Sequence, residues 1–254
     1  QIYKKYDNNI VIGKSDKNNE EYDVLIFVDR YIEKVAIPPC IKKIASYAFA
    51  NCSITEIVIP NSVTEIGEGS FMECNKLQKI EISPNESKLK TIGGKAFNST
   101  LISNFTIPSN VVSIGEYCFE YSNKNIEYSP DSKLKVMNNF GFCNLENIII
   151  PSNITEFKNK WFDYKLKNIK IDDKNRFIKF DENDKFIIGK NDLNKDEFDV
   201  IYYIKNNIKG SITIPSCIKQ INSYSFANSL IEKVIISSQL KEIKMSSKIT
   251  TINP

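Results

Sequence analysis

A string that recurs about every 22 residues is the feature that most limits what this chain can fold into. Residues 37–52 read IPPCIKKIASYAFANC and residues 214–229 read IPSCIKQINSYSFANS, and looser copies fill most of the space between them. Each copy places a phenylalanine a fixed distance after an Ile-Pro step, and these anchor residues are Phe49, Phe71, Phe97, Phe119, Phe140, Phe162 and Phe226. Such self-similarity indicates a chain built from stacked repeat units.

The hydrophobic pattern changes its period inside each unit. The clearest unit, residues 54–74, reads ITEIVIPNSVTEIGEGSFMEC. Its I-x-I step has the period of a β-strand, and the proline ends the strand because it has no N–H for a ladder. Val63 and Ile66 are then three residues apart, which predicts a loop and a short helical or irregular turn that returns the chain. One unit has too thin an apolar face to fold alone, so the units must stack and bury a continuous column of Ile, Leu and Phe.

The repeated pattern I-P-x-x-V-x-x-I-G-x-x-A-F-x-x-C resembles the BspA-like leucine-rich repeat family, over about residues 36–170 and 211–245. The resemblance implies a leucine-rich repeat solenoid of the α/β type that is rich in β-structure. It would form a curved right-handed superhelix with a parallel β-sheet on its concave side. The pattern is weakest around Trp161, and the segment before Phe97 carries an insertion.

Two further segments resemble each other rather than the repeats. YDNNIVIGKSDKNNEEYDVLIFV from Tyr6 matches FDENDKFIIGKNDLNKDEFDVIYYI from Phe180. Both predict strand, polar turn, strand, charged loop and strand, so we interpret each as an irregular β-hairpin module. We expect one elongated domain, 1–254, made of a hairpin module at 1–35, a repeat block at 36–171, a second module at 172–210 and a second block at 211–254.

Composition excludes several functions. The chain has no histidine, which removes Ser-His-Asp and Cys-His catalysis and the commonest metal ligand. Its 34 basic and 31 acidic residues are interspersed and form no basic stripe for nucleic acid. The sequence has no stretch of about 18 apolar residues, so we expect no membrane insertion. Its polar start is not a signal peptide. We therefore expect no enzyme activity and no cofactor.

Three motifs have a functional and a structural interpretation, and in each case we favour the structural one. Gly13-Lys14-Ser15 resembles the end of a phosphate-binding loop but lacks the glycine five residues earlier, where Asn8 stands, so a turn is expected. The acidic clusters 20–23 and 181–184 have no calcium-loop spacing, so solvated turns are expected. Trp161 adjoins an anchor phenylalanine, so packing near the core is favoured over a role as an exposed partner anchor.

The six cysteines follow the repeat. Cys52, Cys74 and Cys143 occupy the third place after an anchor phenylalanine, where other units have Thr100, Ser122 and Ser229. A position that accepts Cys, Thr or Ser is a small, mostly buried site, and without histidine or a C-x-x-C pair it is not a zinc site. We predict free structural thiols. A disulfide between stacked neighbours such as Cys52 and Cys74 stays open as an alternative.

The exposed positions of the repeated strands should align across the units and form the candidate binding surface. This predicted concave face consists of Lys34, Glu56, Val58, Lys79, Glu81, Thr106, Glu127, Ile149, Lys170, Thr213, Lys233 and Ile235. Exposed asparagines occur at the same strand positions, namely Asn104, Asn125, Asn147 and Asn168. The surface thus mixes charge, amide and isolated aliphatic side chains, which suits broad contact with a protein or a polysaccharide. The family resemblance implies a surface or secreted adhesin or antigen that contacts host or matrix proteins or neighbouring cells. An intracellular scaffold for protein–protein interactions is the alternative.

Overall fold

The computed structural model covers the whole chain and describes residues 2–18, 20–122, 125–139, 141, 147–158, 166–227, 229–236, 242–243 and 252–253. The predicted anchors Phe140 and Phe162 lie outside the described residues, as do Trp161 and Cys143.

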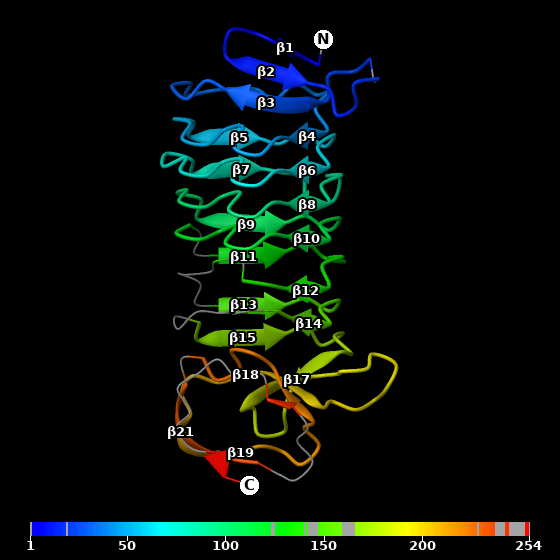
Figure 1. Cartoon of the computed structure of the whole chain (residues 1–254), viewed down its shortest axis with the longest axis vertical. Coiled ribbons are helices and arrows are strands. Elements are labelled where there is room, and N and C mark those ends of the chain that lie inside the picture. Colours follow the sequence, from blue (N-terminus) through cyan, green and yellow to red (C-terminus); the bar gives the residue numbers. More distant parts are fainter. Residues whose placement is uncertain are drawn as a thin grey trace.

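The chain winds into a β-solenoid whose turns stack along the longest axis of the molecule, with the N-terminus and the C-terminus at opposite ends (Figure 1). The I-x-I step of each unit forms a strand of what we call the wide ladder. Its strands are β5 (Glu56–Val58), β7 (Lys79–Glu81), β9 (Asn104–Ile107), β11 (Asn125–Tyr128), β13 (Asn147–Ile150), β15 (Asn168–Ile171), β19 (Lys209–Thr213), β21 (Leu230–Ile235) and β23 (Ile252–Asn253). Strands of successive turns pair in parallel, in the groups β5–β7, β9–β11, β13–β15 and β19–β21–β23.

The segment that returns the chain after each wide-ladder strand is not helical, although a short helical turn was one of the predicted forms. The described residues contain no α-helix. Two-residue strands form instead a second parallel ladder, the narrow ladder, which was not predicted. They are β4 (Lys43–Ile44), β6 (Glu65–Ile66), β8 (Thr91–Ile92), β10 (Ser113–Ile114), β12 (Val136–Met137), β14 (Glu156–Phe157), β20 (Gln220–Ile221) and β22 (Glu242–Ile243).

Left-handed residues on both sides of the first four anchors, Phe49 to Phe119, explain why no helix forms there. Tyr47 and Asn51 flank Phe49 with φ values of 59° and 61°. Alternate backbone N–H groups therefore bond to the next turn, and the Phe49 N–H donates to the Ser70 carbonyl at 2.7 Å. The Phe71 N–H likewise donates to the Ala96 carbonyl at 2.8 Å.

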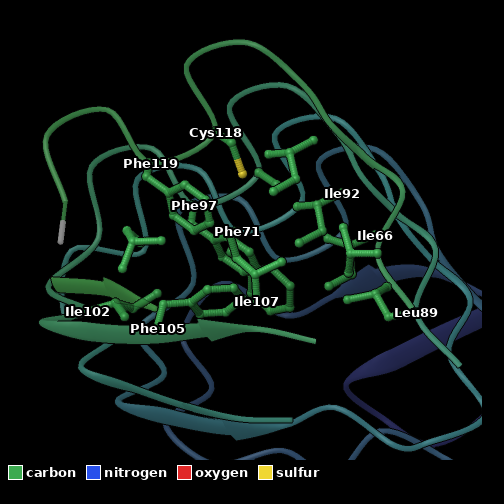
Figure 2. Packing of buried hydrophobic residues seen from close by; sticks show 14 of the residues in the cluster. Ile66, Phe71, Leu89, Ile92, Phe97, Ile102, Phe105, Ile107, Cys118 and Phe119 are labelled. Carbon is green, nitrogen blue, oxygen red and sulfur yellow. The ribbon is translucent and has the colours of Figure 1, made fainter. Parts of the chain in front are cut away.

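The core of the first block is the continuous column that the repeat predicted, and the second block has a separate core cluster around Phe226. The anchors Phe49, Phe71, Phe97 and Phe119 are fully buried. Their rings stack with centroid separations of 4.6, 5.5 and 5.7 Å from one turn to the next. Figure 2 shows this stack lying between Phe105 and Ile107 of the wide ladder and Ile66 and Ile92 of the narrow ladder.

Two hairpin modules interrupt the parallel ladders. The first consists of β1 (Tyr3–Lys5), β2 (Ile10–Gly13) and β3 (Val24–Val28), and the second of β16 (Ile178–Phe180), β17 (Phe186–Gly189) and β18 (Val200–Ile204). Within each module the strands are antiparallel. The third strand of each then pairs in parallel with the narrow ladder, β3 with β4 and β18 with β20.

Candidate binding surface

The outward side of the wide ladder is the wide strand face, and its exposure follows from strand alternation. Ile57 and Ile148 point into the core, so their neighbours in sequence point to solvent. Of the residues predicted from sequence, two are half-buried, Thr106 and Lys233. The others are exposed, namely Lys34, Glu56, Val58, Lys79, Glu81, Glu127, Ile149, Lys170, Thr213 and Ile235.

Near the first module the wide strand face is hollowed by a groove of about 340 Å³. Lys34, Glu56, Val58 and Glu81 line it. In register, Glu56 lies opposite Lys79 and Val58 lies opposite Glu81. Lys79 forms an ion pair with Glu81, and this hydrogen bond raises the pKa of the lysine. The groove therefore combines an aliphatic patch with charges of both signs.

A second groove of about 560 Å³ lies where the wide strand face meets the second module. Glu127, Ile149 and Lys170 line it, together with Tyr203 and Lys205 from the module. Ile149 and Lys170 are direct neighbours in the parallel register. This groove again offers one acidic group, basic groups and an exposed aliphatic side chain.

Asn125, Asn147 and Asn168 line the second groove, and Asn104 lies beside Asn125 in the preceding turn. Asn104, Asn125, Asn147 and Asn168 occupy the same register position in successive turns. The Asn125 amide donates to the Asn104 side-chain oxygen at 2.8 Å, and Asn168 donates in the same way to Asn147 at 2.7 Å. All four asparagines are exposed, and the bond within each pair holds the amides in place.

The other predicted residues lie outside the two grooves. Thr106 is the register neighbour of Glu127. In the second block Thr213 lies opposite Ile235, and Lys233 lies opposite Ser211. Sequence reasoning placed the four asparagines among the exposed strand positions but did not include them in the predicted concave face. It also missed Tyr203 and Lys205, for which the sequence carries no signal because they come from the module.

Comparison with known proteins identifies the repeat. The model of the BspA type leucine rich repeat region matches in six copies over residues 42–170 and 199–252, which is well over half of the chain. The chain belongs to this family. No curated protein matches the chain in sequence.

Three solved structures share the BspA-type fold of this chain. The pneumococcal vaccine antigen PcpA is 18% identical with a TM-score of 0.71, and the match covers 98% of this chain and 69% of that one. A leucine rich cell surface protein from Faecalibacterium prausnitzii is 19% identical with a TM-score of 0.66, covering 96% and 72%. A leucine-rich repeat protein from Bacteroides ovatus is 20% identical with a TM-score of 0.55, covering 98% and 78%.

The small buried position of the BspA-type unit holds its side chain against a backbone carbonyl. Thr100 and Ser122 donate to the carbonyl of their own anchor phenylalanine at 3.0 and 2.7 Å. Cys74 donates instead to the Phe49 carbonyl of the preceding turn at 3.0 Å. Cys52, Cys74 and Cys118 are buried free thiols, whereas Cys40 and Cys217 are exposed free thiols. The predicted structural role therefore fits Cys52, Cys74 and Cys118, and none of the five described cysteines forms a disulfide.

We expect thiol labelling to separate these two groups. Burial raises the pKa of Cys74 to about 12 and raises the pKa values of Cys52 and Cys118 as well. A raised pKa keeps the thiol protonated, so an increase from pH 7 to pH 9 should not activate these three. They should react at least about 100-fold more slowly than Cys40 and Cys217, because labelling requires local opening. Peptide mapping after brief alkylation of the folded chain checks this, and fast labelling of Cys118 would contradict it.

The Gly13-Lys14-Ser15 motif, which we interpreted as a turn, is hydrogen-bonded within its own hairpin module. Asp23 accepts hydrogen bonds from the Ser15 N–H and from its hydroxyl, each at 2.8 Å. Burial opposes ionisation of Asp23, but these bonds outweigh it and lower the pKa of the carboxyl. In the second module Asp199 accepts from the Asn191 N–H at 2.9 Å. In both modules a carboxylate of the chain therefore accepts the backbone N–H that a bound phosphate would need.

Acidic side chains of clusters 20–23 and 181–184 also form hydrogen bonds and ion pairs within the chain. Asp181 accepts from the backbone N–H groups of Lys185 and Phe186, and Glu21 forms an ion pair with Lys42. Within the described part of the chain, no three acidic or cysteine side chains are grouped so that they could hold a metal ion. No helix among the described residues has the length and apolar character of a membrane span.

Proposed function

We propose that this chain is a non-enzymatic binding module that contacts a protein partner through the wide strand face. The observation that carries this proposal is the pair of open grooves on one regular backbone ladder, each lined by both charge signs and an exposed aliphatic residue. Such a surface gives charge complementarity over a broad area. Polysaccharide is a second ligand class for the same face, favoured by the fixed row of asparagine amides.

The named relatives support a surface location. One similar structure is a vaccine antigen and another is described as a cell surface protein. We therefore infer that this chain is displayed at a cell surface or secreted, and that it acts as an adhesin or surface antigen toward host or matrix proteins. Surface labelling of intact cells tests this location, and a protein that stays unlabelled while a known surface protein is labelled would overturn it.

An intracellular scaffold is the second candidate. The five described cysteines are free, and unpaired thiols are commoner in reducing compartments. A scaffold would use the same wide strand face for protein–protein contact. The surface labelling experiment separates the two candidates.

Charge reversal on the wide strand face tests the binding surface. A protein and glycan array first identifies a ligand. The double variant Glu81→Lys with Lys170→Glu then places the wrong charge in both grooves without changing net charge. We expect the affinity to fall by about tenfold or more, which corresponds to about 1.4 kcal/mol or more. Titration calorimetry or surface plasmon resonance measures the change.

A matched control is available on the narrow ladder. Lys43 and Glu65 form an ion pair there at 2.7 Å. The double variant Lys43→Glu with Glu65→Lys also reverses two charges and preserves the pair, so it should leave the affinity unchanged. If the groove variant folds and binds as tightly as the wild type, the partner contacts another surface.

A further inference from the structure

The string S-K-L-K occurs twice, at residues 87–90 and 132–135, in two repeat units that are separated by one further unit. In both copies the leucine is buried and the lysines on either side of it are exposed. The serine is buried as well, and its hydroxyl oxygen accepts the N–H of the leucine, at 3.2 Å in the first copy and 3.4 Å in the second. The same local structure therefore presents two lysines to solvent in each of these turns.

An asparagine of the intervening turn joins the two copies. The Asn110 amide donates to the Ser87 carbonyl at 2.9 Å, and the Lys133 amine donates to the Asn110 side-chain oxygen at 2.6 Å. Asn110 is neutral, so this contact holds the amine in place without cancelling its charge. We call the exposed set Lys88, Lys90, Lys133 and Lys135 the lysine patch.

The lysine patch lies beside the narrow ladder. Its two copies of S-K-L-K lead directly into β8 and β12, and β10 lies between these strands along the axis (Figure 1). None of the four lysines lines either groove of the wide strand face. The patch is therefore separate from the surface proposed above.

Ion pairs neutralise the lysines at the same repeat position in other units. Lys42 and Lys219 take the repeat position of Lys90. Each forms an ion pair with a carboxylate of the adjacent hairpin module, Glu21 and Glu197 respectively. Among the described residues, no carboxylate forms an ion pair with any lysine of the patch. The charge of the patch is thus available to a ligand.

Acidic side chains nearby leave the patch positively charged. Glu65 and Glu156 of the narrow ladder form ion pairs with lysines outside the patch. Glu86 and Asp131 come just before the two S-K-L-K copies. Glu86 is turned toward the preceding unit, where it accepts from the Asn61 amide at 3.1 Å. The four lysines outnumber these two carboxylates, so the patch keeps a net positive charge.

The patch offers side chains and not backbone to a ligand. The Lys90 N–H donates to the Thr64 carbonyl at 2.9 Å, and the Val112 N–H donates to the Lys90 carbonyl at 2.9 Å. An added peptide strand would find these groups occupied. Of the residues at positions 88, 90, 110, 112, 133 and 135, only Val112 is apolar and none is aromatic. These positions therefore supply neither the aromatic anchors typical of protein interfaces nor the stacking platforms that bind single-stranded nucleic acid.

We propose that the lysine patch binds a linear sulfated polysaccharide, independently of the wide strand face. Lysine acts as a point charge toward an anionic group and needs no apolar anchor or stacked ring to do so. Two pairs of lysines in turns on either side of Asn110 give two contact points, which suits a chain that carries charge on successive sugars. Because the contacts are electrostatic and exposed, the affinity depends on salt.

Titration calorimetry of the full chain with a heparin decasaccharide tests this proposal. We expect the wild type to bind, and the affinity to fall at least about tenfold when NaCl is raised from about 50 to about 300 mM. Replacing all four lysines of the patch by glutamine should lower the affinity by at least about tenfold, because the opposite charges no longer meet. Circular dichroism and thermal melting confirm that the variant folds.

A matched variant removes the same charge elsewhere. It replaces four exposed lysines outside the patch by glutamine, namely Lys5, Lys17, Lys76 and Lys174, and its affinity should stay within about twofold of the wild type. Val112→Lys places a further lysine between the two pairs and should raise the affinity by about threefold or more. A gain in affinity cannot result from a loss of folding, so this variant tests the patch independently.

Three further probes identify the class of ligand. A chemically desulfated heparin decasaccharide keeps its carboxylates and should bind at least about tenfold more weakly than the sulfated one. Single-stranded DNA and phosphatidylserine vesicles should also bind more weakly at the same salt concentration. The proposal is wrong if the wild type does not bind the sulfated decasaccharide, or if the patch variant and its matched control lose affinity equally. It is also wrong if DNA or the vesicles bind as tightly as the sulfated decasaccharide.

Discussion

Replacing Phe97 by alanine is expected to lower the free energy of unfolding by about 3–5 kcal/mol. The Phe97 ring is fully buried in the middle of the column, with Phe71 on one side and Phe119 on the other. It also contacts the Phe105 ring of the wide ladder, at a centroid separation of 5.4 Å. The stacked turns hold one another in place, so the surrounding chain cannot collapse into the cavity without breaking ladder hydrogen bonds. We therefore expect a cost within the range for buried aromatic residues and not below it.

Urea denaturation followed by circular dichroism measures this effect. Tyr31→Ala is the control because it removes an exposed aromatic residue, and its effect should stay within about 0.5 kcal/mol. The slope of the transition should be unchanged if unfolding remains cooperative. A loss below about 1 kcal/mol for Phe97→Ala would mean that the column is not the source of stability.

Gly93→Ala should destabilise the fold by about 1–3 kcal/mol although it adds a single methyl group. A Cβ at this position would lie 2.4 Å from the Glu68 nitrogen and 2.5 Å from the Gly67 carbonyl carbon. Both atoms belong to the backbone of the preceding turn, which cannot move away without separating the two turns. Gly115 repeats the arrangement one turn later, where a Cβ would lie 2.2 Å from the Gly94 nitrogen.

Gly94→Ala is the matched control for Gly93→Ala. Its Cβ would come no closer than 3.1 Å, to the Glu116 oxygen, so a small shift relieves the contact. Thermal melting of both variants should show a clearly larger decrease for Gly93→Ala. Equal decreases would mean that glycine flexibility in the unfolded chain, and not the close approach of the turns, accounts for the effect.

The repeat explains which parts of the fold could be predicted from sequence. The strand step, the anchor stack and the small buried position recur at a fixed spacing, so each unit supports the same prediction. The narrow ladder could not be predicted, because a two-residue strand is too short to show a period. The left-handed turns were missed for a different reason. Many of them fall on residues such as Tyr47, Lys95 and Tyr117, which give none of the usual glycine or asparagine signals.

The sequence predicted which residues of the candidate surface are exposed, but not the grooves between them. Strand alternation correctly placed residues such as Glu56 and Lys170 on the exposed side of the ladder. The grooves were not predictable, because the second groove needs Tyr203 and Lys205 from a module that is inserted between the repeat blocks. Whether these residues bind a partner stays a prediction.

The contacts between turns also bear on how such a chain changes over evolutionary time. Each turn bonds chiefly to its immediate neighbours: the ring stack runs on from Phe71 to Phe119, and the narrow ladder keeps one register from β4 to β8. Duplication or deletion of one whole unit in the gene would therefore leave every remaining unit with an acceptable neighbour. A loss or gain of residues within a strand would break the pairing of that turn, whereas the longer loop between β7 and β8 leaves β6 and β8 paired in register. Variation in length should consequently occur in whole units or in such loops, and each added unit would extend the exposed face by one row of residues that is free to diverge.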